Sequence, residues 1–407
     1  MNRQTRLLII FLIAVVLSLL AYCSGESPGN VGTLVRDIAE IVLTEEAALA
    51  ETPQGTGTPA ATRENALPTL PPVVPATATM PQTASPTSTS LYTVYFTDPE
   101  CPPEEERSGG IEDEIAADLL QARERVEIAA FDLDAEPIID ALITLEQENI
   151  DVRVVTDSDN GDLSGIRRLR RHGISVVEDK RSGLMHNKFI VIDARILWVG
   201  SLNFTTNGFY CNNNNLVRFE SAELAANYVA EMAEMYDERS FGPKSPENTP
   251  NEILTLGGMA VANYFSPERE LELINIIARA VVRAEEEILF LAFSFTSDEI
   301  GEAMLGRADA GIPVRGIFER VGAQSGYYPV MAASGLPNVM VRLDGNPRIM
   351  HHKVIIVDRT TVIFGSFNFT ASANRSNDES IIVVTDPDFA QIFVDEFYRL
   401  WEIAVEE

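Results

Sequence analysis

The chain has 407 residues, of which 45% are hydrophobic and 23% are charged. This composition is typical of a globular protein and excludes a largely disordered one, and the length allows two or three domains. The formal net charge is −30 at pH 7. Because so acidic a surface repels polyanions at long range, non-specific nucleic-acid binding gets no help from the overall charge, although a local basic site is not excluded.

The amino-terminal segment, residues 1–23, has the pattern of an export signal. Two arginines precede an uncharged apolar run that ends at Tyr22, which is the order of regions in a signal peptide. The next residue, Cys23, stands where bacterial lipoproteins carry their lipid-attachment cysteine, but Tyr22 replaces the small residue usual before it. A lipoprotein and an uncleaved signal anchor are both open, and the chain is predicted to be exported, either membrane-anchored or secreted.

Residues 24–90 are predicted to be a spacer. Residues 31–51 fit one amphipathic helix or a stalk, and residues 52–90 are dominated by Thr, Pro, Ala and Ser. Such a composition buries too little apolar surface to offset the entropy of folding, and proline favours extended chain. The spacer would hold the rest of the protein away from a membrane surface.

From residue 91 the sequence is globular and repeats itself. Short β-branched runs alternate with stretches of helical pattern, at 111–124, 135–148, 222–238 and 269–285. The matching segments come in the same order in both halves, and they include "VYFTDP" (94–99) with "NYFSPE" (263–268), "IDVRVVTD" (150–157) with "IPVRGIFE" (312–319), and "WVGSLNFTTNG" (198–208) with "IFGSFNFTASA" (363–373).

The repeat predicts an α/β fold made of two pseudo-symmetric domains, each a mixed β-sheet flanked by helices, packed around one shared active site. We place the first domain at 91–245, a Pro- and Gly-containing linker at 246–260, and the second domain at 261–407. Since both copies lie in one chain, a monomer suffices for a complete site.

One polar pattern, His-x-Lys-x4-Asp-x6-Gly-Ser-x-Asn, occurs once in each half. The chain has four His and four Lys in all, and half of each fall inside this pattern, which makes coincidence a poor explanation. Hydrophobic identities vary between the copies while these polar identities recur. The two copies are His186, Lys188, Asp193, Gly200, Ser201 and Asn203, and His351, Lys353, Asp358, Gly365, Ser366 and Asn368.

On a strand, residues i and i+2 point to one face, so the His and Lys of each copy project together. Two halves packed about a pseudo-twofold axis would bring two imidazoles and two ammonium groups to one cleft, a combination suited to phosphate. Lysine binds the charge and stabilises the transition state, one histidine attacks phosphorus, and the other transfers protons. Asp193 and Asp358, where each strand ends, are expected to orient or charge-balance a basic partner.

The doubled motif resembles that of the phospholipase D superfamily, and the resemblance extends over about residues 91–407. It implies a metal-independent, two-step displacement through a phosphohistidine, with His186 as nucleophile and His351 as general acid and base, although the pseudo-symmetry permits the reverse order. It also implies that the lysines contact phosphate together with Asn203 and Asn368, with Ser201 and Ser366 nearby. Glu379 matches a family acid that supports a catalytic histidine, whereas its counterpart in the first half is Asn214.

Other polar residues have plainer interpretations. His352 faces away from His351 on a strand, so a structural role is favoured over metal ligation, and His172 ends an arginine-rich helical stretch that is predicted to be a solvated face. Cys101 and Cys211 form a disulfide or remain two thiols. With no Cys-x-x-Cys and no His pair at ligand spacing, zinc is not expected. The resemblance implies a metal-independent site, and no metal or other cofactor is predicted.

Three functions fit the sequence. The first is a phospholipase D-type hydrolase acting on phospholipid, which a membrane-proximal enzyme would have within reach. The second is a secreted or surface-anchored endonuclease of the same superfamily, which the net charge disfavours. The third is a catalytically silent binding domain, which the intact motifs disfavour. Superfamily membership does not decide the substrate, and the first function is preferred.

Overall fold

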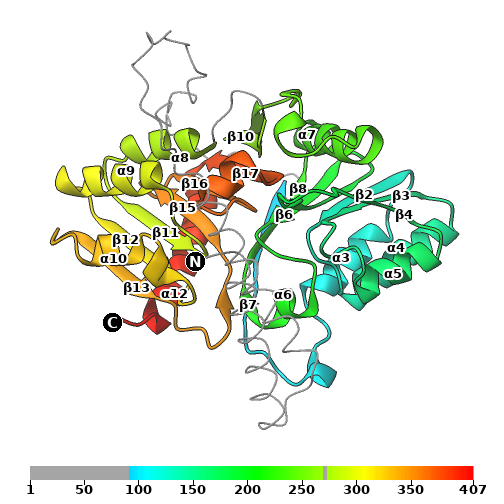
Figure 1. Cartoon of the computed structure of the whole chain (residues 1–407), viewed down its shortest axis with the longest axis horizontal. Coiled ribbons are helices and arrows are strands. Elements are labelled where there is room, and N and C mark those ends of the chain that lie inside the picture. Colours follow the sequence, from blue (N-terminus) through cyan, green and yellow to red (C-terminus); the bar gives the residue numbers. More distant parts are fainter. Residues whose placement is uncertain (1–90, 269–272, 407) are drawn as a thin grey trace, which may run out of the picture.

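The computed structural model describes residues 91–268 and 273–406. The predicted export signal (1–23), Cys23 and the predicted spacer (24–90) lie outside the described residues. The described chain forms two α/β halves, whose sheets lie side by side in Figure 1.

The first half is built on a seven-stranded mixed sheet. Strands β2, β3 and β4 are parallel, while β5, β6, β8 and β1 are antiparallel to their neighbours. The strand order is β1-β8-β6-β5-β2-β3-β4. In that order the strands are Tyr92–Phe96, Asn215–Glu220, Ile196–Gly200, Lys188–Ile192, Arg125–Ala130, Asp151–Thr156 and Ser175–Glu178.

The second half repeats this sheet and adds one strand. Its order is β13-β12-β11-β15-β16-β17-β10-β9. Read backwards from β10 to β13, these strands correspond one by one to β1-β8-β6-β5-β2-β3-β4 of the first sheet, in agreement with the predicted pseudo-symmetry. In that order the strands are Val339–Leu343, Val314–Phe318, Ile288–Ala292, Lys353–Val357, Thr361–Gly365, Glu379–Thr385, Met259–Ser266 and Ile253–Leu256.

The added strand corrects the predicted linker. β9 (Ile253–Leu256) pairs antiparallel with the start of β10, so residues 253–260 belong to the second sheet and the connector is shorter than 246–260. The alternating burial of Ile253, Leu254, Thr255 and Leu256 shows a half-buried edge strand. Four residues are too few for that alternation to stand out among turn-forming neighbours.

Helices cover both sheets. Those of the first half are α3 (Ile111–Leu119), α4 (Glu136–Gln147), α5 (Ser164–Arg171), α6 (Thr206–Tyr210) and α7 (Ala222–Ala233), and those of the second are α8 (Leu273–Val282), α9 (Asp298–Asp309), α10 (Tyr328–Ala332), α11 (Ala371–Arg375) and α12 (Pro387–Ile403). A π-helical turn, Glu234–Glu238, extends α7, and short 3-10 turns lie at Glu104–Glu106, Gly242–Lys244 and Ala323–Ser325. Ser221 and Asp386 cap α7 and α12 by accepting hydrogen bonds from backbone N–H groups, which satisfies donors that a helix start leaves open.

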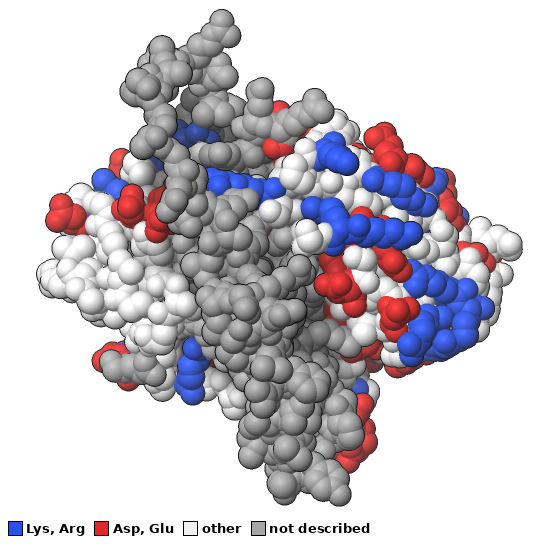
Figure 2. All heavy atoms as spheres, in the orientation of Figure 1, with Lys and Arg blue, Asp and Glu red and all other residues white. Residues whose placement is uncertain are grey.

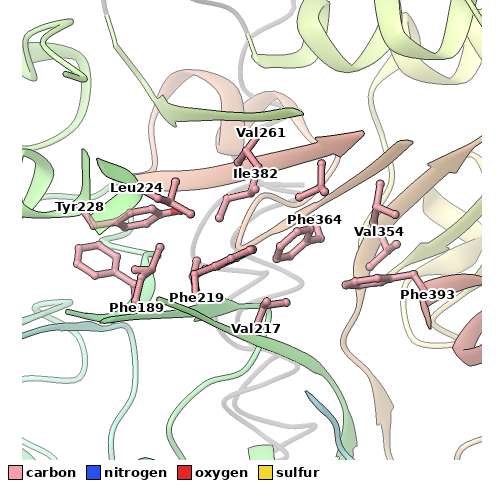
Figure 3. Packing of buried hydrophobic residues seen from close by; sticks show 14 of the residues in the cluster. Phe189, Val217, Phe219, Leu224, Tyr228, Val261, Val354, Phe364, Ile382 and Phe393 are labelled. Atoms are coloured by element: carbon pink, nitrogen blue, oxygen red, sulfur yellow. The ribbon is translucent and has the colours of Figure 1, made fainter. Parts of the chain in front are cut away.

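The main core lies between the two sheets. Within each strand the side chains alternate, so that Phe189 and Val191 of β5 enter this core while Ile190 and Ile192 enter the outer core of the first half. Helices α7 and α12 contribute Tyr228 and Phe393, among others, and Figure 3 shows them among the strand residues of both halves. One shared core of this size makes the two halves a single packed unit.

The outer faces have their own cores. α3, α4 and α5 pack on the outer face of the first sheet, and α8, α9 and α10 pack on that of the second; Figure 1 shows these helices on opposite sides of the molecule. Among the described residues, no helix combines the length and apolar character needed to cross a bilayer.

Short strand pairs join the halves across a seam. β7 (Asn212–Asn213) of the first half pairs in parallel with β14 (Ile349–Met350) of the second. The equivalent contact in the other direction is a parallel bridge between Met185 and Asp378. Each half thus extends a segment onto the other just before its histidine motif, and this places both motifs on the seam.

Candidate active site

The first histidine–lysine pair lies against one phenyl ring. Lys188 begins β5 opposite Ala130, the last residue of β2, and Phe131 follows directly. The Lys188 ammonium lies 5.1 Å from the centre of the Phe131 ring, and the His186 ring stands edge-on to it with centroids 5.1 Å apart. The two side chains therefore share one side, as their spacing predicts, and the aromatic face attracts the cation.

The second pair repeats this arrangement. The Lys353 ammonium lies 4.4 Å from the centre of the Phe293 ring, and the His351 ring is edge-on to the same phenyl group at 4.6 Å. Each lysine also donates a hydrogen bond to the main-chain carbonyl of its own histidine, over 2.9 Å and 3.0 Å. Sequence reasoning missed both phenylalanines, although they recur directly after equivalent strands.

His186 receives its polar partner from the opposite half. Its Nδ1 lies 2.7 Å from Oε2 of Glu379, the first residue of β17, and both side chains are fully buried. A carboxylate is an acceptor only, so Nδ1 carries the proton, and the lone pair of the neutral ring lies on Nε2. The same carboxylate stabilises positive charge on the ring.

His351 has a different partner in the equivalent place. Its Nδ1 lies 2.9 Å from Oδ1 of Asn214 in the first half. The orientation of this amide is set independently, because its Nδ2 donates to the Gly208 carbonyl over 3.0 Å and the Ser201 hydroxyl donates to its Oδ1 over 3.0 Å. His351 Nδ1 is therefore a donor too, but to a neutral oxygen. The two histidines are equivalent in position and unequal in electrostatics.

The Gly-Ser step of the motif brings two backbones together. A Cβ on Gly200 would lie 2.2 Å from the Asn215 carbonyl oxygen, and one on Gly365 would lie 2.1 Å from that of Ser380, so only glycine fits. The Ser201 and Ser366 hydroxyls then accept hydrogen bonds from the N–H groups of those same residues, over 3.1 Å and 3.0 Å. These serines position the start of β8 and β17, where Asn214 and Glu379 lie.

The asparagines of the motif follow β6 and β16. Asn203 and Asn368 are buried, and their amide groups retain hydrogen-bonding capacity: Oδ1 of Asn203 and both polar atoms of the Asn368 amide have no partner among the described residues. Buried polar groups of this kind are costly unless a ligand or water satisfies them. Nδ2 of Asn368 can therefore donate to an oxygen atom of a bound anion, whereas the unpartnered atom of Asn203 is an acceptor.

Asp193 and Asp358 do not take the expected role. Each lies just beyond the far end of its strand, so it is separated from its histidine by the whole strand length, about 23 Å of extended chain. Asp193 accepts hydrogen bonds from the backbone N–H groups of Arg123, Glu124 and Arg125 over 2.9–3.0 Å. Partial burial raises the pKa of Asp193, but the hydrogen bonds from these backbone donors outweigh it, so the pKa is lowered overall.

The equivalent Asp358 accepts from the backbone N–H groups of Glu285, Glu286 and Glu287. Both aspartates also adopt positive φ, 50° and 53°, in the turn that follows the strand. They therefore fasten a turn to the loop before the neighbouring strand, rather than orienting the lysine or histidine. The fixed spacing in both copies reflects the length of that strand.

Two buried carboxylates hold the loops that lead into the histidines. Asp157 accepts from the N–H of Met185 over 2.9 Å, and Glu319 accepts from the N–H of Met350 over 2.6 Å. Burial raises the pKa of Asp157 to about 7, helped by the nearby Asp179, and raises that of Glu319 to about 8. These residues end the matched segments 150–157 and 312–319, and sequence reasoning did not assign them a role.

His352 is a buried structural residue. Its Nδ1 lies 3.0 Å from Nδ2 of Asn215 and its Nε2 lies 3.4 Å from Oε1 of Glu396, and burial lowers its pKa although Glu396 opposes that shift. His172 lies exposed at the end of α5. No group of three or more His, Cys, Asp or Glu side chains suited to a metal ion occurs in the described part of the chain.

Cys101 and Cys211 form a disulfide that joins the loop after β1 to the end of α6. β7 begins at the next residue, Asn212. The disulfide therefore ties down the segment that crosses the seam and leads to Asn214.

The fold and the seam define a duplicated α/β protein with two equivalent histidine–lysine pairs, and comparison with known proteins agrees. The family model described as "Cardiolipin synthase, PLD-like domain" matches residues 115–236 and 277–401, more than half of the chain and one segment in each half. The chain therefore belongs to this family, within the phospholipase D superfamily.

Individual relatives match one part of the chain. The mitochondrial cardiolipin hydrolase of Homo sapiens is 33% identical over 133 residues, which is 32% of this chain and 51% of that protein. The phospholipase D of Rickettsia felis is 29% identical over 160 residues, 39% of this chain and 78% of that protein. The chain thus spans about half the length of the human relative.

Among solved structures, the phosphatidylserine synthase of Haemophilus influenzae Rd KW20 has the same fold over most of the chain. The TM-score is 0.57 at 15% sequence identity, and the match covers 77% of this chain and 87% of that one. This likeness extends across both halves, in agreement with the pseudo-symmetric arrangement of the two sheets.

Proposed function

We propose that this chain is a phospholipase D-type phosphodiesterase that hydrolyses a phospholipid without a metal ion, through a phosphohistidine. The carrying observation is the pair of histidines on the seam, each of which has its Nδ1 engaged by a residue of the opposite half. Histidine suits both nucleophilic and proton-transfer roles near neutral pH.

In the first step Nε2 of His186 attacks phosphorus, and the bond from phosphorus to the leaving oxygen breaks. The positive charge that develops on the His186 ring is balanced by the carboxylate of Glu379, which accepts a hydrogen bond from Nδ1–H. His351, protonated on Nε2, donates that proton to the leaving alcohol. Because the ring is paired with the neutral oxygen of Asn214, it holds the proton less tightly than a carboxylate-paired ring would, which suits an acid.

In the second step a water attacks the phosphohistidine. His351, now neutral, takes a proton from the water as the bond between phosphorus and His186 Nε2 breaks, and a phosphomonoester leaves. Both histidines return to their starting states, so no outside reactant besides water is needed.

The remaining motif residues bind the phosphate. The ammonium groups of Lys188 and Lys353 are almost completely buried, and a phosphodiester anion offsets part of the cost of burying them. The amide of Asn368 supplies a hydrogen bond to one of its oxygens through Nδ2. Preorganised donors of this kind act most strongly where water is excluded, because the local dielectric is low.

Phospholipid is the favoured substrate on two grounds. The net charge of −30 disfavours approach of a nucleic acid, and the similar proteins carry the names cardiolipin hydrolase and phospholipase D. The apolar amino-terminal run and the disulfide are both in keeping with export to an oxidising compartment. An exported, membrane-tethered enzyme would have phospholipid within reach.

The test is hydrolysis of a nitrophenyl phosphodiester, with phospholipid vesicles and plasmid DNA assayed in parallel. We expect hydrolysis of the generic diester and of the lipid, no effect of EDTA, and loss of both activities in His186→Ala. Loss of activity on chelation would overturn the metal-free mechanism. Cleavage of plasmid without cleavage of lipid would assign the nuclease function instead. Mass spectrometry of the mature amino terminus decides between lipidation at Cys23 and an uncleaved anchor.

A further inference from the structure

One exposed face of the first half is basic, in contrast to the protein as a whole. Arg167, Arg170 and Arg171 lie on α5 at positions i, i+3 and i+4, and are therefore on one side of the helix, while Ile166 and Leu169 on the other side are buried. All three arginines are exposed. Figure 2 shows Lys and Arg side chains gathered over α5 at the right of the view.

A pocket of about 350 Å³ adjoins α5 at the edge strand β4, and its lining includes Arg170, Lys180 and Arg239. Its apolar wall is formed by Val176, Val177 and Phe241. We call the surface formed by Arg167, Arg170, Arg171, Lys180 and Arg239 the α5 basic face. Two acidic side chains also line the pocket, Glu178, which is paired with Arg170, and the buried Asp179, which lies 3.6 Å from Arg181.

Most of these cations are not used by the fold. Neither Arg167 nor Arg171 makes a side-chain hydrogen bond or ion pair within the described residues, whereas Arg168 on the same helix pairs with Glu136 and Asp140. Lys180 is exposed and has no such partner in the described chain either.

The pseudo-symmetry provides an internal comparison. α10 lies between β12 and β13, as α5 lies between β3 and β4, and it packs on the equivalent outer face of its sheet. Yet residues 321–341, which contain α10, include no charged side chain. The second half thus forms the same sheet without an equivalent basic face, so the shared fold does not require Arg167 and Arg171.

The basic face is also close to the histidine seam. One row across the sheet joins Lys188 to Ala130, Ala130 to Thr156, and Thr156 to Glu178. Three strand spacings separate the ends of this row, about 14 Å. The pocket at β4 therefore lies at the same end of the strands as the first histidine–lysine pair. The separation between them is comparable to the width of a few lipid headgroups.

From these observations we infer that the α5 basic face docks the protein onto an anionic lipid bilayer, with a headgroup phosphate in the pocket at β4. The inference rests on the proposed action on phospholipids. Each basic residue near an anionic membrane adds to the attraction, and the rest of this acidic protein is repelled. An anionic bilayer is therefore expected to bind the protein with the α5 basic face toward the lipid. This orientation brings the end of the strands that carries Lys188 toward the lipid surface.

The test uses the full chain reconstituted in vesicles of phosphatidylcholine, with or without about 30% phosphatidylglycerol, so that any amino-terminal tether is present in both samples. Hydrogen–deuterium exchange is followed for residues 164–181. We expect slower exchange only in the anionic vesicles, and loss of this protection in about 0.5 M NaCl and in the double variant Arg167→Glu, Arg171→Glu. Residues 323–332, which contain α10, should exchange equally in both.

A double variant with the same change in net charge, Arg123→Glu with Arg283→Glu, is the matched control and should keep the protection. Equal exchange in the two kinds of vesicle, or unchanged protection in the α5 variant, would overturn the docking. Protection of 164–181 by duplex DNA instead of by vesicles would assign the face to nucleic acid and would also overturn it.

Hydrolysis of a soluble nitrophenyl diester, measured on the same samples, separates the two proposals. Protection without hydrolysis supports the docking and contradicts the proposed function. Hydrolysis without protection contradicts the docking alone.

Discussion

Glu379 and His186 belong to opposite halves of the chain and form a buried hydrogen bond, with Oε2 2.7 Å from Nδ1. The equivalent bond across the seam joins Asn214 to His351 over 2.9 Å. A duplication that places the two histidines in equivalent positions has thus given one of them a charged partner and the other a neutral partner. This difference is the physical basis for assigning them different roles.

Replacing Glu379 by Gln should lower kcat by at least about a hundredfold. Gln keeps the size of the side chain and a hydrogen-bond acceptor, but it removes the negative charge that stabilises the His186 imidazolium in the covalent intermediate. Steady-state kinetics on a nitrophenyl diester measure the effect. Glu379→Asp retains the charge and should recover part of the rate, and equal rates in the Gln variant and the parent would contradict the assignment.

Replacing Asn214 by Asp should move the alkaline limb of the pH–rate profile upward by about one pH unit. A carboxylate 2.9 Å from Nδ1 would favour the protonated form of the His351 ring, so the acid would stay protonated to higher pH. The profile of kcat/KM against pH measures the shift. Asn203→Asp changes the same residue type elsewhere at the site, and an equal shift in that variant would show that the effect does not pass through His351.

The protein should be more stable at mildly acidic pH than at pH 8. Burial raises the pKa of Glu127 and Asp157 to about 7 and that of Glu319 to about 8, well above the values of an unfolded chain. Between pH 4 and 8 the folded protein therefore binds more protons than the unfolded one, and its stability falls as the pH rises through this window.

The midpoint of thermal unfolding should be higher at pH 5.5 than at pH 8 by about 5 °C or more. Opposing groups are few among the described residues. The pKa of His352 is lowered by burial, which costs stability below about pH 6.5. The lowered pKa values of Asp193 and Glu396 cost stability only as the pH falls below about 4.5. A flat or rising profile between pH 5.5 and 8 would contradict this balance.

Gly200→Ala and Gly365→Ala should each destabilise the protein by about 2 kcal/mol or more, because the new methyl group would overlap a carbonyl oxygen of the neighbouring strand. Gly306→Ala is the matched control. It lies within α9 with open space around the added Cβ, so the same change should be neutral or stabilise by up to about 1 kcal/mol. Denaturant unfolding measures all three.

Removing the disulfide with Cys101→Ser and Cys211→Ser together should lower the free energy of unfolding by about 3 kcal/mol. The bond closes a loop of 110 residues, so its loss restores much conformational freedom to the unfolded chain. Unfolding with and without a reducing agent gives the same comparison on the parent protein. Unfolding that is insensitive to reduction would show that the thiols do not pair in solution.

Much of the fold was readable from the sequence. The helical stretches at 111–124 and 135–148 correspond to α3 and α4, and the apolar runs after His186 and His351 correspond to β5 and β15. Such elements are set by local periodicity, which one segment carries by itself. The duplication was equally plain, because polar identities recurred at fixed offsets while apolar ones varied. Phe131 and Phe293 recur as well, but in sequence an apolar residue directly after a buried strand cannot be distinguished from a core residue.

The fixed spacing of Asp193 and Asp358 led to a wrong role. Recurrence of a residue indicates that it is needed but does not indicate its role. In the structure, both aspartates accept hydrogen bonds from backbone N–H groups and fasten turns at the far ends of the strands. Strand length separates them from the histidines, and a spacing in sequence does not state which backbone N–H groups will lie nearby.

By itself the sequence determined which residue types recur and which of them share a strand face, because the backbone geometry within one strand is local. Only the tertiary structure decided that Glu379 serves His186 and that Asn214 serves His351. Those partners are 193 and 137 residues apart. They meet because two sheets bury a common core against α7 and α12, and this packing fixes which residues face each other across the seam.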